Sequence, residues 1–354
     1  MIDYIVFFIG FYIFFLLLSI FFKKFQNIFI FILIIFLAVF GINNIEHLSL
    51  DYYNYKLIFD ISNAYGWGEL INFGDPLFLY LVKFLYIVFQ DYKIIFLILI
   101  ILSLLLKYFI CIKFVPKSIL PIFIFLLIGR FYILHDLTQI RASLAIGLMT
   151  IALLLYYKNN FVLSFKIIFL YIIGVLFHVS ILIVLFLIFF INRLIRVNNF
   201  IYFYLFIVVS IFLGYFLSNY LYFIISNFNF IDRVGLYFSG DGETQNVKYS
   251  VFQFYFILKF LVLMLLSNYY IRMNDFQRAL VVTYVYAMCL QALFVFSSAI
   301  GLRFAAIFGY IDILVLLMPL TISYYRKYYN PYFVFVSLVG VVFFYSALLT
   351  IGMK

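Results

Sequence analysis

Residues 94–112 have the sequence IIFLILIILSLLLKYFICI, and this stretch decides the fold class. It contains one charged residue, Lys107, and it approaches the ~20 apolar residues that an α-helix needs to cross a bilayer. A continuous apolar run predicts a helix, because the strands of a membrane barrel alternate in polarity. We place about 13 such runs, near residues 4–22, 28–42, 76–90, 94–112, 119–134, 139–157, 161–177, 179–192, 200–218, 251–271, 279–298, 304–324 and 332–350.

The composition supports the same conclusion. The 354 residues are 69% hydrophobic and 10% charged, whereas a soluble domain is roughly half apolar and about one quarter charged. Secreted, cytosolic and nucleic-acid-binding soluble proteins are therefore excluded. We expect an all-α polytopic integral membrane protein with about 12–13 hydrophobic helical segments, forming one membrane domain over residues 1–354.

The charged residues, cysteines and histidines argue against a nucleic-acid-binding surface, a disulfide framework and a metal centre. The net charge of +10 comes from cations in the short gaps between apolar runs, which the positive-inside rule explains. Cys111 and Cys289 each lie in an apolar run, so we interpret both as small buried hydrophobes. With 3 His in the chain, a metal centre built from several histidines is not expected. No cofactor is expected either, because the sequence has no Gly-rich phosphate loop, HExxH or CxxC motif.

The distribution of charge predicts an orientation in the membrane. The loops 43–75 and 219–250 are rich in acidic residues and are expected to be external. If Lys23, Lys24, Lys113, Lys117 and Lys158 are all cytoplasmic while loop 43–75 is external, one run between residues 76 and 112 cannot cross the membrane. Run 76–90, which is short and contains Lys83, is the best candidate for a re-entrant or interfacial segment. The alternative is that Lys113 and Lys117 break the rule. The gaps expected in the cytoplasm contain Lys23 and Lys24, Lys158, Arg193 and Arg196, Arg272 and Arg278, and Arg326 and Lys327.

Arg141 is the clearest candidate for a functional residue. It lies in HDLTQIRASLA, residues 135–145, where a polar stretch enters a long apolar helix. An ionisable group at such a place is costly, and its guanidinium is suited to holding an anion through two hydrogen bonds. The alternatives are an arginine that snorkels to the interface or one that pairs with Asp136.

His178 interrupts a long apolar stretch that runs from residue 161 to 192. A tight break at FHVS, residues 177–180, would divide it into two short spans and place His178 on the same side as Arg141. The imidazole is then a candidate proton acceptor, or a hydrogen-bond donor to an oxyanion. A histidine that caps the helix break is the structural alternative.

The first external loop supplies further candidates at its two ends. Asp51, in DYYNY at residues 51–55, is a candidate base or sugar ligand, and Tyr52 and Tyr55 could stack on sugars. An interfacial aromatic belt explains the tyrosines equally well. Asp75, in GDP at residues 74–76, is a candidate sugar-binding residue, or only the start of a helix with proline in its first turn.

The C-terminal half contains one more candidate. Arg303 lies in SSAIGLRF, residues 297–304, which we interpret as an external break where a second cation would help neutralise a diphosphate. An ordinary loop arginine is the alternative. Asp312 lies deep in an apolar run, and we expect it either to satisfy a buried polar network or to pair with Lys259. The sequence does not separate snorkelling from pairing for Lys107, Arg130 and Lys166.

The motifs DYYNY, DPLF, IRASLA and FHVS, in this order and spacing over residues 45–190, resemble those of the EpsG family. This family comprises bacterial exopolysaccharide-biosynthesis membrane proteins related to the Wzy-type polymerases of O-antigen and capsule. The family often has glutamine directly after the arginine, whereas here Ala142 follows Arg141 and Gln139 precedes it by two residues. No role is therefore transferred to a glutamine.

The resemblance implies a GT-C/Wzy-like helical bundle in the bacterial cytoplasmic membrane. It implies a glycosyltransferase-type polymerase that joins oligosaccharide repeat units carried on undecaprenyl diphosphate at the outer face, with a chain-length regulator as a candidate partner. In this scheme Arg141 and Arg303 hold the diphosphate, and His178 or Asp51 accepts the proton of the acceptor hydroxyl. Two alternatives are a single-addition glycosyltransferase using a polyprenyl-phosphate sugar, and a flippase or transporter of the lipid-linked unit.

Overall fold

In the computed structural model, the described residues are 2–216, 220, 253–295, 298–322, 325 and 328–350. Every regular element within them is a helix and none is a strand, which confirms an all-α polytopic membrane protein. Apart from Tyr220, the predicted external loop 219–250 lies outside these residues. The chain divides into two compact units, one formed by Met1–Leu182 with Leu317–Lys354 and the other by Ile183–Leu316.

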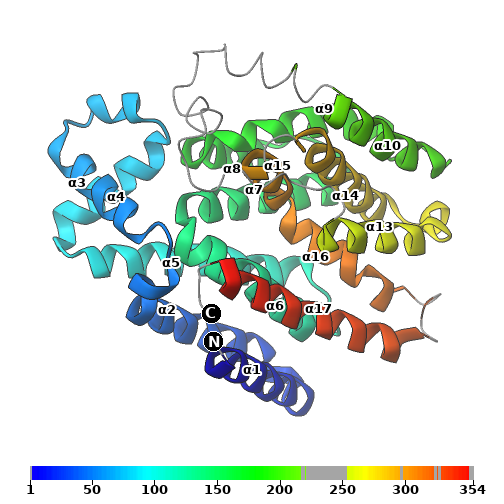
Figure 1. The fold of residues 1–354 in the computed structure, drawn as a ribbon, viewed down its shortest axis with the longest axis horizontal. Coiled ribbons are helices and arrows are strands. Elements are labelled where there is room, and N and C mark those ends of the chain that lie inside the picture. The colour runs from blue at the N-terminus through cyan, green and yellow to red at the C-terminus, as the bar shows by residue number, and fades with distance from the viewer. Residues whose placement is uncertain are drawn as a thin grey trace. The chain divides into compact units, whose positions relative to one another are not determined.

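The helices follow the predicted apolar runs closely (Figure 1). The first unit contains α1 (Ile2–Phe21), η1 (Lys23–Phe25), α2 (Gln26–Leu48), α3 (Tyr52–Ala64), η2 (Glu69–Phe73), α4 (Pro76–Phe89), α5 (Tyr92–Phe114), α6 (Leu120–Leu127), η3 (Ile128–Thr138), α7 (Ile140–Lys158), α8 (Phe165–Phe177), η4 (Val179–Ile183), η6 (Met318–Leu320) and α17 (Tyr329–Thr350). The second contains α9 (Val184–Leu194), α10 (Ile201–Phe216), α13 (Phe254–Ser267), η5 (Tyr270–Arg272), α14 (Asp275–Leu293), α15 (Ser298–Ile307) and α16 (Gly309–Leu317).

Six helical stretches among the described residues are long and apolar enough to cross a membrane. They are Gln26–Leu48, Tyr92–Phe114, Leu120–Thr138, Ile140–Lys158, Asp275–Leu293 and Tyr329–Thr350. The predicted run 304–324 is not one straight helix, because α15 ends at Ile307 and the chain bends by 62° before Gly309–Leu320 continues. Asp312 lies in the first turn of α16, where the free amides of a helix N-terminus favour a carboxylate.

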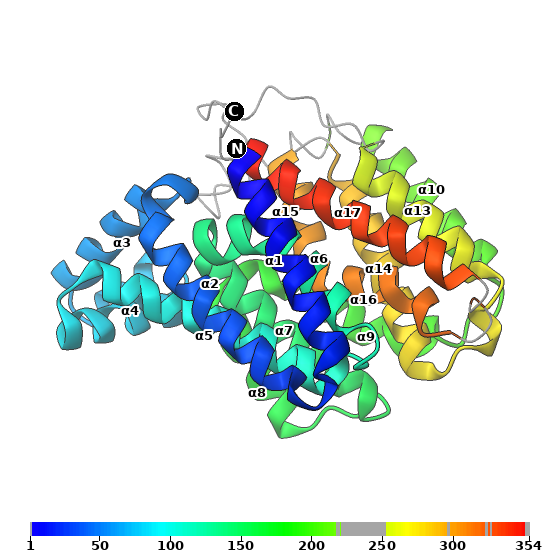
Figure 2. The same cartoon turned by 90° about the horizontal axis from the view of Figure 1, so that it is seen from below.

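Helix α7 forms the interior of the first unit and contacts both α5 and α8. Most of its side chains are buried, so it has little surface left for lipid. The stretch before it is equally enclosed: α6 continues into η3, an 11-residue π-helix, and α17 packs against both (Figure 1, Figure 2). A π-helix of this length is rare, and π-helical turns occur frequently at functional sites.

Helices α3 and α4 form a hairpin within the first unit, and Lys83 joins them. The Lys83 ammonium donates to the carbonyl oxygens of Ser62, at 3.2 Å, and of Tyr65 at the C-terminal end of α3. A cation is favoured there by the helix dipole, so the lysine within run 76–90 has partners inside the protein. The 14 residues of α4 span roughly 21 Å, less than the hydrocarbon core, but α8 and α13 with 13 and 14 residues are equally short, so the re-entrant character of this segment stays a prediction.

Candidate functional site

The candidate site is built around Asp75, which lies between η2 and α4. Gly74 and Asp75 both have positive φ angles, 73° and 50°, and Pro76 then begins α4. The left-handed conformation is unfavourable for most side chains, but aspartate tolerates it better than most. The turn directs the carboxylate of Asp75 into the protein, where the side chain is 7% exposed.

Arg141 lies in the first turn of α7 and forms an ion pair with Asp75. Its Nη1 atom lies 2.8 Å from Oδ2 of the carboxylate, and its backbone amide donates to the hydroxyl of Tyr55 at 3.4 Å. The guanidinium also lies 5.9 Å from the ring centroids of Tyr55 and Phe78, within cation–π range. The alternative pairing with Asp136 is wrong, because Asp136 pairs with Lys107.

His178 approaches the same carboxylate oxygen from α8. The chain leaves the helix at this residue, with φ −161° and ψ 113°, so the predicted break is confirmed. Its Nδ1 atom lies 3.6 Å from Oδ2 of Asp75, slightly beyond hydrogen-bond distance. The side chains of His178 and Arg141 are 24% and 28% exposed, so both remain accessible to a ligand.

The surroundings of Asp75 favour its charged form. Burial raises the pKa of the carboxyl, but His178, Arg141 and the backbone amide of Val179 together hold that pKa below its usual value. Asp75 is therefore ionised at neutral pH. One buried anion thus faces two accessible groups that can bind an anion or exchange a proton.

The other candidates of the first external loop lie on α3 and near its start. Tyr55 is buried and contacts Arg141, and Asp51 is close enough to Tyr55 for its charge to influence the hydroxyl. Tyr52 is also buried, and its hydroxyl donates to Glu46 at 2.8 Å while its ring stacks on Phe96. Both tyrosine rings are therefore packed against protein in this structure.

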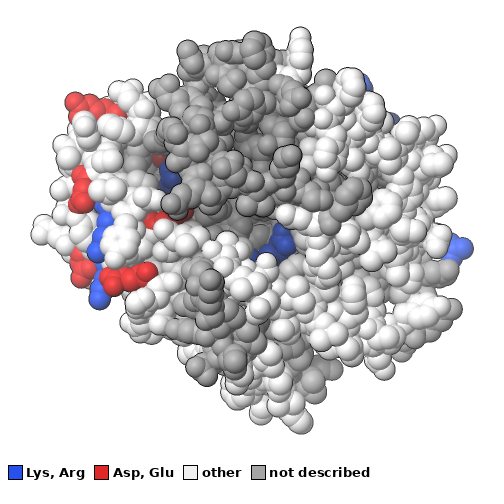
Figure 3. Space-filling view, viewed as in Figure 1, with Lys and Arg blue, Asp and Glu red and all other residues white. Residues whose placement is uncertain are grey.

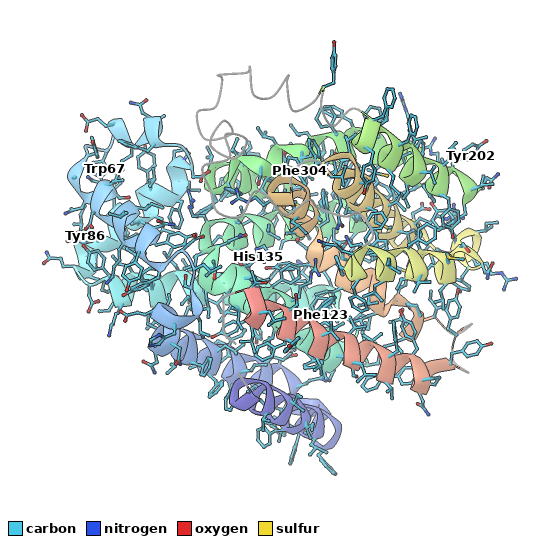
Figure 4. All side chains as sticks on the ribbon, in the orientation of Figure 1. Trp67, Tyr86, Phe123, His135, Tyr202 and Phe304 are labelled. Carbon is cyan, nitrogen blue, oxygen red and sulfur yellow. The ribbon has the colours of Figure 1, made fainter. Side chains whose placement is uncertain are left out.

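Arg303 belongs to the second unit. It is exposed on α15, within a helix and not in the irregular break that we predicted, because the bend comes later, between Ile307 and Gly309. Its neighbour Phe304 is labelled in Figure 4. The expected partner of Asp312 is confirmed: Nζ of Lys259 lies 2.5 Å from Oδ2 of Asp312, with both side chains 1% exposed.

The sequence comparison adds independent evidence on identity. The profile of the EpsG family matches residues 27–353, nearly the whole chain. The chain belongs to the EpsG family. Neither the comparison with curated proteins nor the comparison with solved structures gave a match.

Membership of the EpsG family supports a role in bacterial polysaccharide biosynthesis and implies, in general terms, a polymerase-type glycosyltransferase. The matched region contains the three residues of the site, Asp75, Arg141 and His178. Within the part of the chain that the structure describes, no three His, Cys, Asp or Glu residues are grouped so that they could hold a metal ion.

The EpsG-family chain also contains a cluster of buried polar side chains that we did not predict from the sequence. Lys107 of α5 pairs with Asp136 of η3, and Oδ1 of Asp136 also accepts hydrogen bonds from Ser103 at 2.5 Å and Ser143 at 2.7 Å. We call these four residues the buried cluster. Ser103 and Lys107 are four residues apart, which places them on one face of α5 and was the available signal.

Proposed function

We propose that the protein is a polysaccharide polymerase that joins oligosaccharide repeat units carried on undecaprenyl diphosphate. The observation that supports this proposal best is the convergence of Arg141 and His178 on one carboxylate oxygen of Asp75. A guanidinium suited to phosphate and an imidazole suited to proton transfer then lie beside each other. Glycosyl transfer from a lipid diphosphate requires both functions.

In the proposed reaction, a hydroxyl of one lipid-linked repeat unit attacks the anomeric carbon of the growing glycan. A new C–O bond forms there while the bond to the lipid diphosphate breaks, and the diphosphate leaves with the bonding electrons. His178 accepts the proton that the hydroxyl loses. Arg141 binds the leaving diphosphate, whose negative charge grows as the bond breaks.

Asp75 links the two functions in this scheme. A diphosphate that binds Arg141 competes with Asp75 for the guanidinium, which leaves the carboxylate available to His178. The Nδ1–Oδ2 separation of 3.6 Å needs only a small movement to become a hydrogen bond. Asp75 would then orient the imidazole, as a carboxylate does in a catalytic triad.

We propose that the reaction takes place at the outer face of the cytoplasmic membrane, because the charge pattern favours an external position for the α3–α4 hairpin. Exposed acidic residues gather on and beside this hairpin, including Asp60, Glu69 and Asp91 (Figure 3). Arg303 is proposed as a second ligand of the diphosphate, and Asp51 as an alternative proton acceptor. Tyr52 and Tyr55 are proposed to border the sugar-binding region, with Tyr55 supporting Arg141 directly.

The proposal is tested by the size distribution of lipid-linked and surface glycan in cells that lack the gene and carry wild type, Arg141→Ala or Arg303→Ala. Arg193→Ala, an exposed arginine outside the site, is the matched control. We expect wild type and Arg193→Ala to restore a ladder of chain lengths, and Arg141→Ala to accumulate single repeat units on the outer surface at normal protein level.

Other results would support other functions. Single units trapped inside the deletion strain would indicate a flippase, and a truncated repeat unit would indicate a single-addition transferase. Normal long chains in cells carrying Arg141→Ala would refute the role assigned to this arginine.

A further inference from the structure

The buried cluster lies inside the first unit, away from any solvent contact. The side chains of Lys107 and Asp136 are 3% and 0% exposed, and the cluster joins three helices: α5, η3 and α7. Lys107 reaches α7 directly, because its Nζ atom lies 3.0 Å from the hydroxyl of Ser143. His135, the residue before Asp136, is also buried within η3 (Figure 4).

The cluster spans the junction at which η3 ends and α7 begins. Gln139 separates the two helices, with φ −113° and ψ 53°, which is not a helical conformation. The bond from Ser143 to Asp136 crosses this junction, and Ser143 and Arg141 lie in the same first turn of α7. The orientation of that turn is therefore fixed by side chains as well as by the backbone.

Stability alone is a poor explanation for such a cluster. Replacing a buried ion pair with apolar residues of similar volume is often neutral or stabilising, because the desolvation of two charges offsets their attraction. What the ion pair supplies and apolar packing lacks is direction: the carboxylate of Asp136 accepts from Ser143 in one geometry. That geometry sets where the first turn of α7 points.

We propose that Lys107 and Asp136 are positioning residues, which hold the first turn of α7 so that Arg141 reaches Asp75 and, on substrate binding, the diphosphate. The contact of Arg141 with the diphosphate rests on the proposed function, whereas its contact with Asp75 does not. Separate measurements therefore test the two contacts.

The first measurement follows the geometry of the turn without any substrate. The chain has 2 cysteines, so Cys111→Ala and Cys289→Ala create a background in which Ala142→Cys, next to Arg141, is the single thiol. The labelling rate of this thiol by a charged maleimide is measured in nanodiscs. We expect it to change by about threefold or more in Lys107→Met/Asp136→Leu, because the turn gains local freedom.

The matched control is the other buried ion pair, through Lys259→Met/Asp312→Leu, which removes the same chemistry from the second unit. We expect this control to leave the labelling rate at position 142 unchanged. An unchanged rate in Lys107→Met/Asp136→Leu would overturn the proposal. Equal changes in both double variants would also overturn it, since general loosening would then explain the effect.

The second measurement uses farnesyl diphosphate as a probe of the anion site, with binding to the purified protein in nanodiscs. We expect Lys107→Met/Asp136→Leu to weaken binding by roughly tenfold to a hundredfold, the order of loss that a small misplacement causes. Lys259→Met/Asp312→Leu is expected to bind like wild type. Binding of wild-type strength in the first double variant would contradict the positioning role.

If wild type itself bound no farnesyl diphosphate, the proposed diphosphate site would fail, and the labelling rate would still decide whether the cluster positions the turn.

Discussion

Nη1 of Arg141 lies 2.8 Å from Oδ2 of Asp75, and this ion pair joins the first turn of α7 to the start of α4. An arginine near the N-terminus of a helix is opposed by the helix dipole, so a partner of opposite charge is needed there. A bound anion can replace that partner. The ion pair therefore indicates that a ligand of Arg141 must offer a negative charge.

The first prediction concerns the shape of the Arg141 side chain. Arg141→Lys retains the positive charge but loses the planar fork that binds two phosphate oxygens together. We expect the rate of polymer formation to fall by about tenfold to a hundredfold, the equivalent of one or two charge-assisted hydrogen bonds. Gel analysis of glycan chain length over time measures the rate, with Arg193→Lys as control. Equal rates would show that charge alone is sufficient.

The second prediction separates proton transfer from binding. His178→Gln removes the base but leaves Arg141 and Asp75 in place, so farnesyl diphosphate binding should remain within about twofold of wild type while polymer formation falls by roughly 10²- to 10⁴-fold. His47→Gln, an exposed histidine outside the site, is the control and should match wild type in both assays. Normal polymer formation by the His178→Gln protein would show that another group acts as the base, and Asp51 would be the next candidate.

The sequence indicated the single residues of this site but not their contacts, because these residues lie far apart along the chain. Arg141, His178 and Asp75 each stand out locally, as a cation entering an apolar helix, a histidine at a helix break and an aspartate before proline. Their meeting at one oxygen depends on the packing of α4, α7 and α8, which sequence periodicity does not describe. The same limit applies to Lys107 and Asp136.

The fold was predicted better than the site because apolar run length determines helices in a membrane directly. Helix α3 was missed within the predicted loop 43–75, although its buried residues Tyr52, Tyr55, Phe59 and Ser62 follow helical spacing. The π-helix η3 was not predicted: its sequence IGRFYILHDLT is more polar than its apolar neighbours, but polarity alone does not distinguish a π-helix from an α-helix.

The third prediction concerns acid stability. Asp75→Asn keeps the left-handed turn, which asparagine tolerates, and removes the charge that Arg141 and His178 contact. Because the folded-state pKa of Asp75 is lowered from 3.8, its ionised form stabilises the protein fully above that pH. The stabilisation is lost as the pH falls below 3.8 through the lower folded-state pKa.

The measurement is the difference in Tm between wild type and Asp75→Asn in detergent, at a series of pH values from neutral to strongly acidic. We expect the free energy of unfolding of wild type to exceed that of Asp75→Asn by about 1–3 kcal/mol at neutral pH, as for hydrogen bonds to charged groups. Wild type should therefore have the higher Tm at neutral pH, and the Tm difference should shrink in acid. Asp275→Asn, an exposed carboxylate on α14, should show little difference at any pH. A Tm difference independent of pH would exclude the charge of Asp75 as its cause.

The fourth prediction tests the α3–α4 hairpin, which carries Tyr55 and leads into Asp75. Its turn contains Trp67 (Figure 4). The ring of Trp67 packs on Tyr80 and lies 5.5 Å from the ammonium of Lys83. Lys83→Met retains most of the side-chain volume but leaves the carbonyl oxygens of Ser62 and Tyr65 without their donor. We expect the hairpin to lose about 1–3 kcal/mol of stability, the cost of unsatisfied buried acceptors.

Hydrogen exchange of the α3 and α4 amides measures this loss, because it reports local opening of the hairpin separately from unfolding of the whole protein. Lys93→Met, an exposed lysine at the start of α5, is the control and should exchange like wild type. Faster exchange confined to α3 and α4 would establish that Lys83 holds the hairpin together. Since the hairpin carries Tyr55, the contact between Arg141 and Tyr55 should weaken as well, and farnesyl diphosphate binding should change in the Lys83→Met protein but not in Lys93→Met.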